Sequence, residues 1–225
     1  MKFVVTAGPT REHLDPVRFL SNPSTGKMGF AVARAAAMRG HEVALVAGPV
    51  SLKTPKGVRR IDVTSAREML AAVEEEMSKA KSGKPTVFVA TAAVADWRPA
   101  KCAARKLKKG QMSGILKLVR NPDILKTVAR RTKHQAPARI ARASTIFVGF
   151  AAETNDVIAE ARRKCREKNL DMIVANDVTE KGSGFGVDTN RVTFVRKDGS
   201  VDRLPLMTKL AVARRIVREC EDLCP

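Results

Sequence analysis

Two glycine-containing segments near the N-terminus are candidates for binding phosphate groups. Residues 6–12 (TAGPTRE) follow an apolar run but lack the GxGxxG spacing of a dinucleotide-binding loop. Residues 21–29 (SNPSTGKMG) contain a Gly-Lys pair. A Walker A loop, however, needs a glycine where Ser21 stands and a Ser or Thr where Met28 stands. Neither of these common phosphate-binding loops is therefore complete.

A simpler phosphate-binding feature remains in the second segment. Ser24 and Gly26 precede a helical pattern, and the free backbone N–H groups at a helix N-terminus bind anions. Gly29 has no side chain, so a ligand or a strand can approach the helix closely there. The alternative is that Gly29 serves helix packing alone.

Polar and aromatic residues also follow the later apolar runs. Asp96 comes after four small or β-branched residues, and it either pairs with a neighbouring cation or accepts hydrogen bonds from a ligand. Phe150 ends another run and is either a core side chain or a platform on which a base stacks. Lys164 and Lys168 are one helical turn apart, so we expect a bound anion or Glu160 to offset their repulsion.

The chain is strongly basic, and the charge is concentrated in one region. Its 225 residues include 42 Lys and Arg against 23 Asp and Glu, a net charge of +19. Residues 101–168 carry 18 Lys and Arg against 5 Asp and Glu, and they include the basic segments 101–110 and 135–144, predicted to be mobile loops. Nucleic-acid binding would need interleaved stacking aromatics, and this region offers only Phe147 and Phe150 in an apparently buried strand. A small polyanion such as a nucleoside triphosphate and a simple solvated surface remain the other interpretations.

The elements that must position these residues alternate between strands and helices. Predicted strands cover residues 3–6, 42–47, 86–91, 145–150 and 172–175. Their nearly continuous apolar character indicates burial on both faces, as in a parallel sheet between helices. We predict an α/β fold with a doubly wound, mainly parallel Rossmann-like sheet and a C-terminal β-hairpin extension. Ligands of such folds bind beyond the carboxyl ends of the strands, where the candidate segments lie.

Capping residues indicate where the predicted helices begin. Ser65 and Glu68 form a capping box, and Asn121 with Pro122 and Asp123 supplies a cap, a first-turn proline and an acid. The remaining predicted helices begin near Gly26, Asn155 and Thr208.

The last third of the chain departs from the alternating pattern. Residues 192–195 and 201–204 flank an Asp-Gly turn, which predicts a β-hairpin. We expect one domain over residues 1–225, in which residues 176–206 form a hairpin or dimerisation extension. The glycine-rich residues 181–186 suit a lid or a dimer contact.

Composition excludes several functional classes. No segment approaches the roughly 20 apolar residues that span a bilayer, and no export signal opens the chain. The four cysteines form no CxxC pair, so we expect reduced thiols, no metal site and a cytoplasmic location. The chain has no Tyr, which excludes the short-chain dehydrogenases, and the missing GxGxxG disfavours nicotinamide oxidoreductases generally.

Eight segments in order resemble one family over nearly the whole chain. They read TAGPTRE, SNPSTGKMGFAVA, AAVADWRPA, KLKK, LVRNPDIL, GFAAETND, KNLDMIVANDV and FGVDTNRVTF. Together they resemble bacterial phosphopantothenate-cysteine ligase, usually the C-terminal half of a bifunctional protein. The resemblance implies that a nucleoside triphosphate activates the carboxylate of 4′-phosphopantothenate, giving an acyl-nucleotide and pyrophosphate, and that the amine of L-cysteine then attacks.

The resemblance also assigns roles by position. The implied catalytic residues are Asn22 and Lys106, and the implied substrate contacts are Arg18, Asn22, Ala92, Ala93 and Asp96. The implied nucleotide contacts are Gly8, Ser24, Gly26, Gly29, Asp96, Lys106, Val119, Arg120, Asn121, Pro122, Phe150, Lys164, Lys168 and Asn176. Lys106 begins the KLKK segment, which in this family accompanies the use of CTP. The implied co-substrate is therefore CTP with Mg²⁺, and an ATP-using ligase or a nucleic-acid-binding protein is the alternative.

The resemblance further implies a homodimer, in which Arg18 reaches the substrate phosphate of the neighbouring subunit. The usual upstream decarboxylase half does not precede the first strand, so we expect a standalone ligase or an excised domain, with a decarboxylase as a possible separate partner. Catalysis by positioning and charge neutralisation needs no nucleophilic Ser or Cys and no histidine base. His13, His41 and His134 accordingly lie outside every motif.

Overall fold

The computed structural model describes residues 1–79, 84–108, 114–135 and 145–224. Its centre is an eight-stranded sheet with the strand order β13-β12-β10-β9-β6-β1-β4-β5. The strands from β10 to β5 are parallel to one another, whereas β12 and β13 are antiparallel. The predicted doubly wound, mainly parallel α/β sheet with a C-terminal hairpin is therefore confirmed.

The main-sheet strands are β1 (Lys2–Ala7), β4 (Glu42–Ala47), β5 (Val58–Asp62), β6 (Thr86–Ala90), β9 (Thr145–Glu153), β10 (Met172–Asp177), β12 (Thr193–Arg196) and β13 (Val201–Arg203). The helices are α1 (Lys27–Met38), α2 (Ala66–Ser78), α3 (Ile124–Gln135), α4 (Val157–Glu167) and α5 (Lys209–Asp222). Three two-stranded ribbons join β2 (Arg11–His13) to β3 (Phe19–Ser21), β7 (Trp97–Pro99) to β8 (Leu118–Arg120), and β11 (Thr189–Asn190) to β14 (Met207–Thr208).

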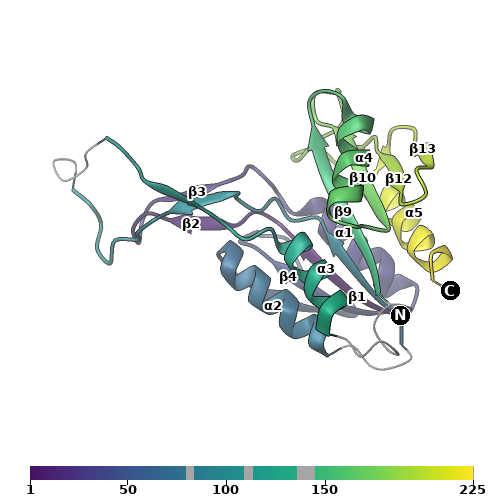
Figure 1. Ribbon diagram of the computed structural model, residues 1–225, viewed down its shortest axis with the longest axis horizontal. Coiled ribbons are helices and arrows are strands. Elements are labelled where there is room, and N and C mark those ends of the chain that lie inside the picture. The colour runs from purple at the N-terminus through teal and green to yellow at the C-terminus, as the bar shows by residue number, and fades with distance from the viewer. Residues whose placement is uncertain (80–83, 109–113, 136–144, 225) are drawn as a thin grey trace.

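Helices cover both faces of the sheet because the strands are apolar on both. Alternate residues of β1 point to opposite sides, so Phe3 and Val5 pack with α1 and α5, whereas Val4 packs with α2, α3 and α4. Figure 1 shows the two groups of helices on either side of the strands. The small side chains of α1 let that helix lie against β1 and β4.

The predicted strands and helices all appear, with differences at their ends. Ser65 caps α2 as predicted, its Oγ accepting a hydrogen bond from the Glu68 N–H at 3.3 Å. The other two caps were misplaced. Asp156 rather than Asn155 precedes α4, and Asp123 rather than Asn121 accepts from the first turn of α3, at the Lys126 N–H. Of the basic segments 101–110 and 135–144, which were predicted to be mobile loops, residues 101–108 contain no helix or strand, whereas residues 109–110 and 136–144 lie outside the described part.

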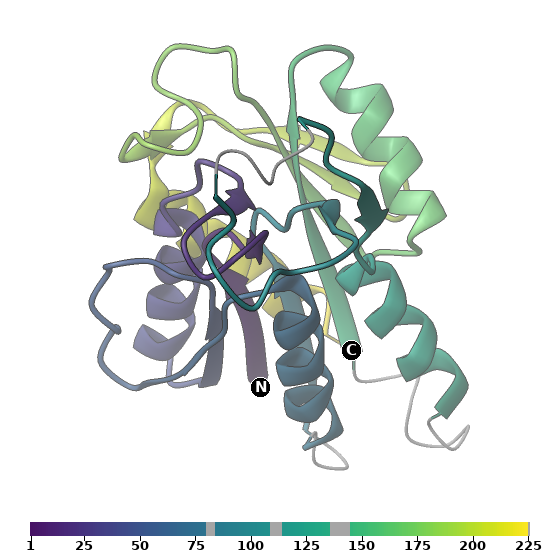
Figure 2. The same ribbon diagram turned by 90° about the vertical axis from the view of Figure 1, so that its left-hand side faces the viewer.

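The ribbons β2–β3 and β7–β8 extend from the carboxyl-end edge of the sheet. We call residues 11–21 together with 97–108 and 114–120 the arm, which projects farthest from the helices in Figure 1 and points towards the viewer in Figure 2. The Ala103 N–H donates to the Leu14 carbonyl at 2.8 Å, which ties the two ribbons together. Exposed apolar side chains of the arm are Val17, Phe19, Trp97, Ile115, Leu116 and Leu118.

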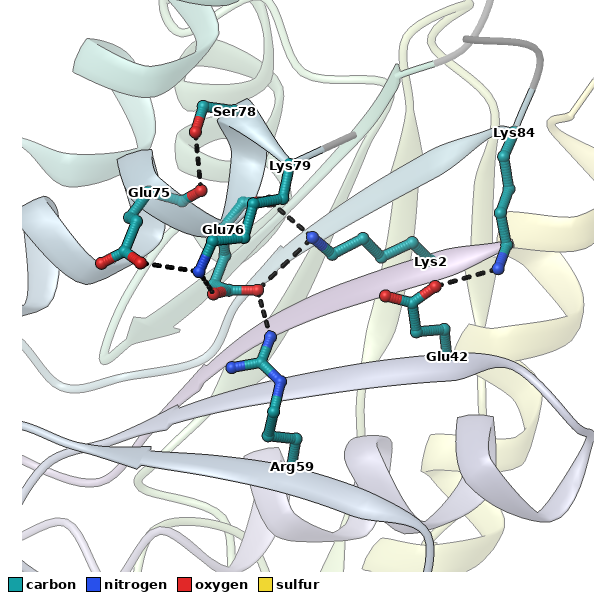
Figure 3. A network of polar contacts seen from close by, with 8 residues as sticks. All are labelled: Lys2, Glu42, Arg59, Glu75, Glu76, Ser78, Lys79 and Lys84. Atoms are coloured by element: carbon teal, nitrogen blue, oxygen red, sulfur yellow. Dashed lines mark hydrogen bonds and ion pairs between the residues drawn. The ribbon is translucent and has the colours of Figure 1, made fainter. Parts of the chain in front are cut away.

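A buried charge cluster stabilises the opposite end of the sheet, where both termini lie (Figures 1 and 3). The fully buried Glu76 of α2 lies 3.4 Å from Lys2 Nζ and 2.9 Å from Lys79 Nζ, and it also pairs with Arg59. Burial alone would raise the pKa of Glu76, but these cations outweigh it and lower the pKa to about 2. The cluster therefore holds an ionised carboxylate inside the protein.

Candidate functional site

A cavity opens at the carboxyl ends of the central strands, between the start of α1 and the ends of β9 and β10. Seven residues singled out from the sequence line it: Ser24, Gly26, Gly29, Ala92, Ala93, Phe150 and Asn176. They come from four separate segments, which the parallel sheet brings to one edge. Phe150 is only partly buried and forms part of the cavity wall, so it is not simply a core side chain.

The N-terminus of α1 forms part of the cavity wall. Gly26 precedes the helix with φ at 77°, a left-handed conformation that favours glycine. A Cβ on Gly26 would lie 3.3 Å from the Gly8 nitrogen, so the predicted glycine after β1 is directly beside it. A Cβ on Gly29 would lie 2.5 Å from the Ala7 Cβ, which explains the absence of a side chain there. Free N–H groups at this helix end can bind an anion.

Asn22 joins the segment before α1 to the segment after β6. Its Nδ2 donates to the carbonyl oxygens of Ala93 at 3.1 Å and Val94 at 3.2 Å. The Ala93 N–H in turn donates to the Gly8 carbonyl at 2.9 Å. Three predicted segments are therefore hydrogen-bonded to one another beside the cavity.

A second group of predicted residues gathers where the arm leaves the sheet. The Asn121 N–H donates to the Asp96 carbonyl at 2.8 Å, and Asn121 Nδ2 donates to the Ala95 carbonyl at 2.8 Å. Val119 lies opposite Arg98 in the β7–β8 ribbon. The segment that contains Val119, Arg120, Asn121 and Pro122 thus lies beside Asp96, and none of these residues lines the cavity.

The predicted lysine pair of α4 has acidic partners from other elements. Lys164 pairs with Glu153 at the end of β9, and Lys168 Nζ lies 2.8 Å from Asp123 at the start of α3. Glu160 forms its hydrogen bonds with Arg163, which chiefly lower its pKa, and the nearby charge of Lys164 lowers that pKa further, so Glu160 offsets the pair only from the Lys164 side. Both lysines lie outside the cavity lining.

Lys106 and Arg18 lie on the arm and not in the cavity wall. Lys106 is exposed. Arg18 Nη2 donates to the Leu107 carbonyl at 2.9 Å, and its Nε donates to the buried Asp15 carboxylate at 3.0 Å. The Arg18 guanidinium holds the pKa of Asp15 well below its usual range. Within one chain the structure therefore places these two cations together but apart from the other site residues.

Lys209 belongs to the cavity wall but was missed in the sequence. Its side chain is buried at the start of α5, and its Nζ donates to the carbonyls of Gly184 at 2.9 Å and Phe185 at 3.2 Å. Burial, together with the nearby charge of Lys27, lowers the pKa of Lys209. No sequence signal separates it from the many exposed lysines, because its partners are backbone atoms distant along the chain.

Two residues at the start of α1 bind the same loop. Thr25 Oγ1 donates to the Phe185 carbonyl at 2.8 Å, and Lys27 Nζ donates to the Gly186 carbonyl at 2.9 Å. Lys27 also pairs with Asp188 at 2.7 Å. The glycine-rich loop, which was expected to be a lid or a dimer contact, is in this structure a wall of the cavity attached to α1 and α5.

Within residues 1–79, 84–108, 114–135 and 145–224, no group of three or more His, Cys, Asp or Glu side chains is arranged to hold a metal ion. In the same part of the chain, no helix has the length and apolar character needed to cross a membrane.

The mainly parallel sheet, with a cavity at its strand ends against a helix N-terminus, defines a Rossmann-like α/β domain. Residues 1–223 match the family model described as the DNA/pantothenate metabolism flavoprotein C-terminal domain. The chain belongs to this family.

Similar proteins agree with this assignment. The chain is 47% identical over 218 residues to the "Coenzyme A biosynthesis bifunctional protein CoaBC" of Vibrio cholerae, covering 96% of this chain and 51% of that protein. It is 48% identical over 217 residues to the protein of the same name from Bacillus subtilis, covering 96% and 50%. A crystal structure of the C-terminal domain of a CoaBC protein superposes with a TM-score of 0.78 and 41% identity, covering 99% of this chain and 94% of that one. The chain thus spans about half the length of the curated relatives it matches.

Proposed function

We propose that this chain is a phosphopantothenate-cysteine ligase of coenzyme A biosynthesis that uses CTP. One observation supports this most directly: Gly8, Asn22 and Ala93, which come from three segments of the family pattern, are hydrogen-bonded together beside the α1 N-terminus. The family membership and the names of the relatives point to the same pathway.

In this proposal the cavity binds the nucleotide. The N–H groups at the start of α1 donate to phosphate oxygens, and the nucleoside would pack against Phe150 and Asn176, which line the same cavity. Lys164 and Lys168 would approach the nucleotide by exchanging their partners Glu153 and Asp123 for phosphate oxygens.

The proposed reaction has two steps. A carboxylate oxygen of 4′-phosphopantothenate attacks the α-phosphorus of CTP, the bond to the β-phosphate oxygen breaks, and pyrophosphate leaves. The cysteine amine then attacks the acyl carbon of the acyl-cytidylate, CMP leaves with the bonding electrons, and the nitrogen loses a proton. In this proposal Asn22, which is hydrogen-bonded to Ala93, orients the acyl group between the two steps.

Together the substrates carry about seven negative charges, which the chain must offset at close range. Mg²⁺ would supply part of this compensation. The described residues offer no cluster of three metal-binding side chains, which suits an ion held mainly by the triphosphate oxygens.

We further propose that the protein acts as a homodimer through the arm. Lys106 and Arg18 lie on the arm and not among the residues that line the cavity of their own chain, and the arm exposes six large apolar side chains. A second copy would cover that apolar surface and bring these cations towards a neighbouring cavity. Mixing inactive Arg18→Ala with inactive Asn22→Ala chains should then restore up to about a quarter of the activity, whereas a monomeric enzyme would recover none.

The central test is pyrophosphate release from CTP by the purified chain. Release should require 4′-phosphopantothenate, and L-cysteine should convert the acyl-cytidylate to the amide product. ATP and UTP measured in parallel decide between the CTP enzyme and the ATP-using alternative. Pyrophosphate release that is independent of 4′-phosphopantothenate would contradict the proposal. The relatives are named bifunctional and are twice as long, so we also propose that a decarboxylase supplies the substrate.

A further inference from the structure

Asp15 is a buried carboxylate of the arm to which the family resemblance assigns no role. It lies in the turn between β2 and β3, and it is 0% exposed. Its Oδ1 accepts hydrogen bonds from the backbone N–H groups of Val17 at 2.9 Å and Arg18 at 2.8 Å. These two bonds close the turn, so the turn itself fixes the position of the carboxylate.

The second oxygen of Asp15 joins two different segments of the arm. Oδ2 accepts from Arg18 Nε at 3.0 Å and from the backbone N–H of Leu107 at 3.2 Å. Arg18 Nη2 donates in turn to the Leu107 carbonyl oxygen at 2.9 Å. Asp15 and Arg18 thus bind both polar groups of the Leu107 backbone, although Leu107 is 92 positions from Asp15 in the sequence.

Leu107 directly follows Lys106 in the KLKK segment. Residues 101–108 contain no helix or strand, so the regular hydrogen bonds of such elements do not position Lys106. The bonds between Leu107 and the β2–β3 turn fix the backbone next to Lys106 instead. One carboxylate therefore determines where the Arg18 guanidinium lies and where the chain that carries Lys106 runs.

The negative charge of Asp15 is needed for this arrangement. The Arg18 guanidinium holds the pKa of Asp15 well below its usual range, and the backbone N–H groups of Val17, Arg18 and Leu107 act in the same direction. The carboxylate is therefore ionised at neutral pH, and its hydrogen bonds are of the stronger, charge-assisted kind. An amide cannot replace it, because Asn has one acceptor oxygen, whereas Asp15 accepts through both of its oxygens.

We propose that Asp15 is a positioning residue of the ligase, which sets the Arg18 and Lys106 cations in one arrangement for the anionic substrates. This inference rests on the proposed function, in which Arg18 binds the phosphate of 4′-phosphopantothenate and Lys106 binds the triphosphate of CTP. Asp15 itself contacts no substrate. Its effect is that both cations are oriented before the substrates bind, which is the condition under which fixed charges accelerate a reaction most.

Asp15→Asn tests this role through two kinetic constants. Arg18 would contact a part of the substrate that does not react, so its misplacement should raise the KM for 4′-phosphopantothenate about tenfold. Lys106 would act on the triphosphate in the transition state, so its misplacement should lower kcat about tenfold. The KM for L-cysteine, which neither cation contacts, should change less than about twofold.

The matched control is Glu12→Gln. Glu12 is the other acidic residue of the arm, it is also buried, and its carboxylate accepts from the Ala66 N–H at 2.9 Å. Poorer folding of the arm would lower kcat in both variants and leave each KM unchanged. Asp15→Glu, which keeps the charge but moves the oxygens by one methylene, is used if Asp15→Asn does not fold, and it should show the same two changes.

Amide hydrogen exchange measures the positioning without any activity. The Leu107 N–H should exchange at least about tenfold faster in Asp15→Asn than in wild type or Glu12→Gln, because its acceptor is lost. Unchanged exchange in Asp15→Asn would overturn the inference.

The kinetic outcomes are equally decisive. Constants in Asp15→Asn that match those of Glu12→Gln would overturn the inference. A change in only one of the two constants would also overturn it, because Asp15 would then act on one cation alone. Failure of the proposed function is separate: wild type would release no pyrophosphate with 4′-phosphopantothenate, while the exchange of Leu107 would still show whether Asp15 holds the KLKK segment.

Discussion

The side-chain nitrogen of Asn22 lies 3.1 Å from the carbonyl oxygen of Ala93, to which it donates a hydrogen bond. This bond attaches the segment that leads into α1 to the segment that follows β6. Residues that are 71 positions apart in the sequence therefore keep one relative position at the edge of the cavity.

Asn22→Ala should separate the two proposed chemical steps. Activation of the carboxylate depends on nucleotide positioning and should continue, whereas the acyl-cytidylate loses the group that orients it. We expect amide formation to fall about 100-fold, with about one acyl-cytidylate accumulating per site. Rapid quenching followed by mass spectrometry measures both species. Asn155→Ala is the matched control, and a variant with wild-type product yield would refute the assigned role.

Lys106→Gln should reduce turnover much more than Lys109→Gln. The first lysine of the KLKK segment is assigned to the triphosphate, and loss of one charge that stabilises a transferring phosphoryl group slows a reaction by about 100-fold. Lys109, which lies outside the described residues, serves as the comparison in the same segment, and its substitution should change turnover less than about threefold. Steady-state rates with CTP provide the measurement. Similar losses in both variants would show that the triphosphate is wrongly placed.

Gly29→Ala should weaken both folding and nucleotide binding. The added Cβ would lie 2.5 Å from Ala7 Cβ and 2.9 Å from the Thr6 carbonyl oxygen, so α1 must shift away from β1. Overpacking of this kind lowers the free energy of unfolding by about 1–3 kcal/mol. Urea unfolding and CTP titration measure the two effects. Gly186→Ala is the control, because its Cβ would meet no atom within 4 Å, and equal effects of the two substitutions would contradict this account.

The Glu76 cluster predicts a specific acid sensitivity. The pKa of Glu76 is lowered from 4.5 to about 2 in the folded protein, so its ionised form stabilises the fold above pH 4.5 and this contribution is lost as the pH falls towards 2. The contribution is about 3 kcal/mol at neutral pH, and about 2 kcal/mol of it should be lost between pH 7 and pH 3.

Glu76→Gln tests this assignment, because it leaves the buried Lys2 without its carboxylate. Urea unfolding at several pH values should show a less stable variant at pH 7 and a smaller difference from wild type at pH 3. Glu75→Gln is the matched control, since Glu75 is exposed and pairs with the half-exposed Lys79. A constant difference between wild type and Glu76→Gln across this range would contradict the pKa assignment.

Hydrophobic periodicity was sufficient to predict the five central strands and the helices, because each of these elements carries apolar residues where it packs in the core. The edge strand β5 was missed, since its sequence VRRID alternates charged and apolar residues and gives no continuous apolar run. Each strand of the arm ribbons is only three residues long, and its pairing depends on contacts between separate segments, which no local pattern records.

Residues of the candidate site could be predicted from the sequence where the end of a strand or the start of a helix determines their position. This holds for Ser24, Gly26, Phe150 and Asn176, which all line one cavity. The sequence did not reveal that Lys209 belongs to the cavity wall formed by the loop before β11. Lys209 contacts this loop through backbone carbonyls, which no residue pattern records. In the proposed homodimer Lys106 and Arg18 would reach the cavity of a second chain, and a single sequence contains no direct signal of that geometry.

The side chains of Thr25, Lys27 and Lys209 donate the hydrogen bonds that hold residues 184–186 in the cavity wall. These bonds affect the entropy of ligand binding. A wall that is ordered during folding does not have to be immobilised when the ligand arrives, so that entropic cost is absent from the binding step. Association should therefore proceed without a slow closing phase at this wall, and differences in affinity among nucleotides should reflect their direct contacts.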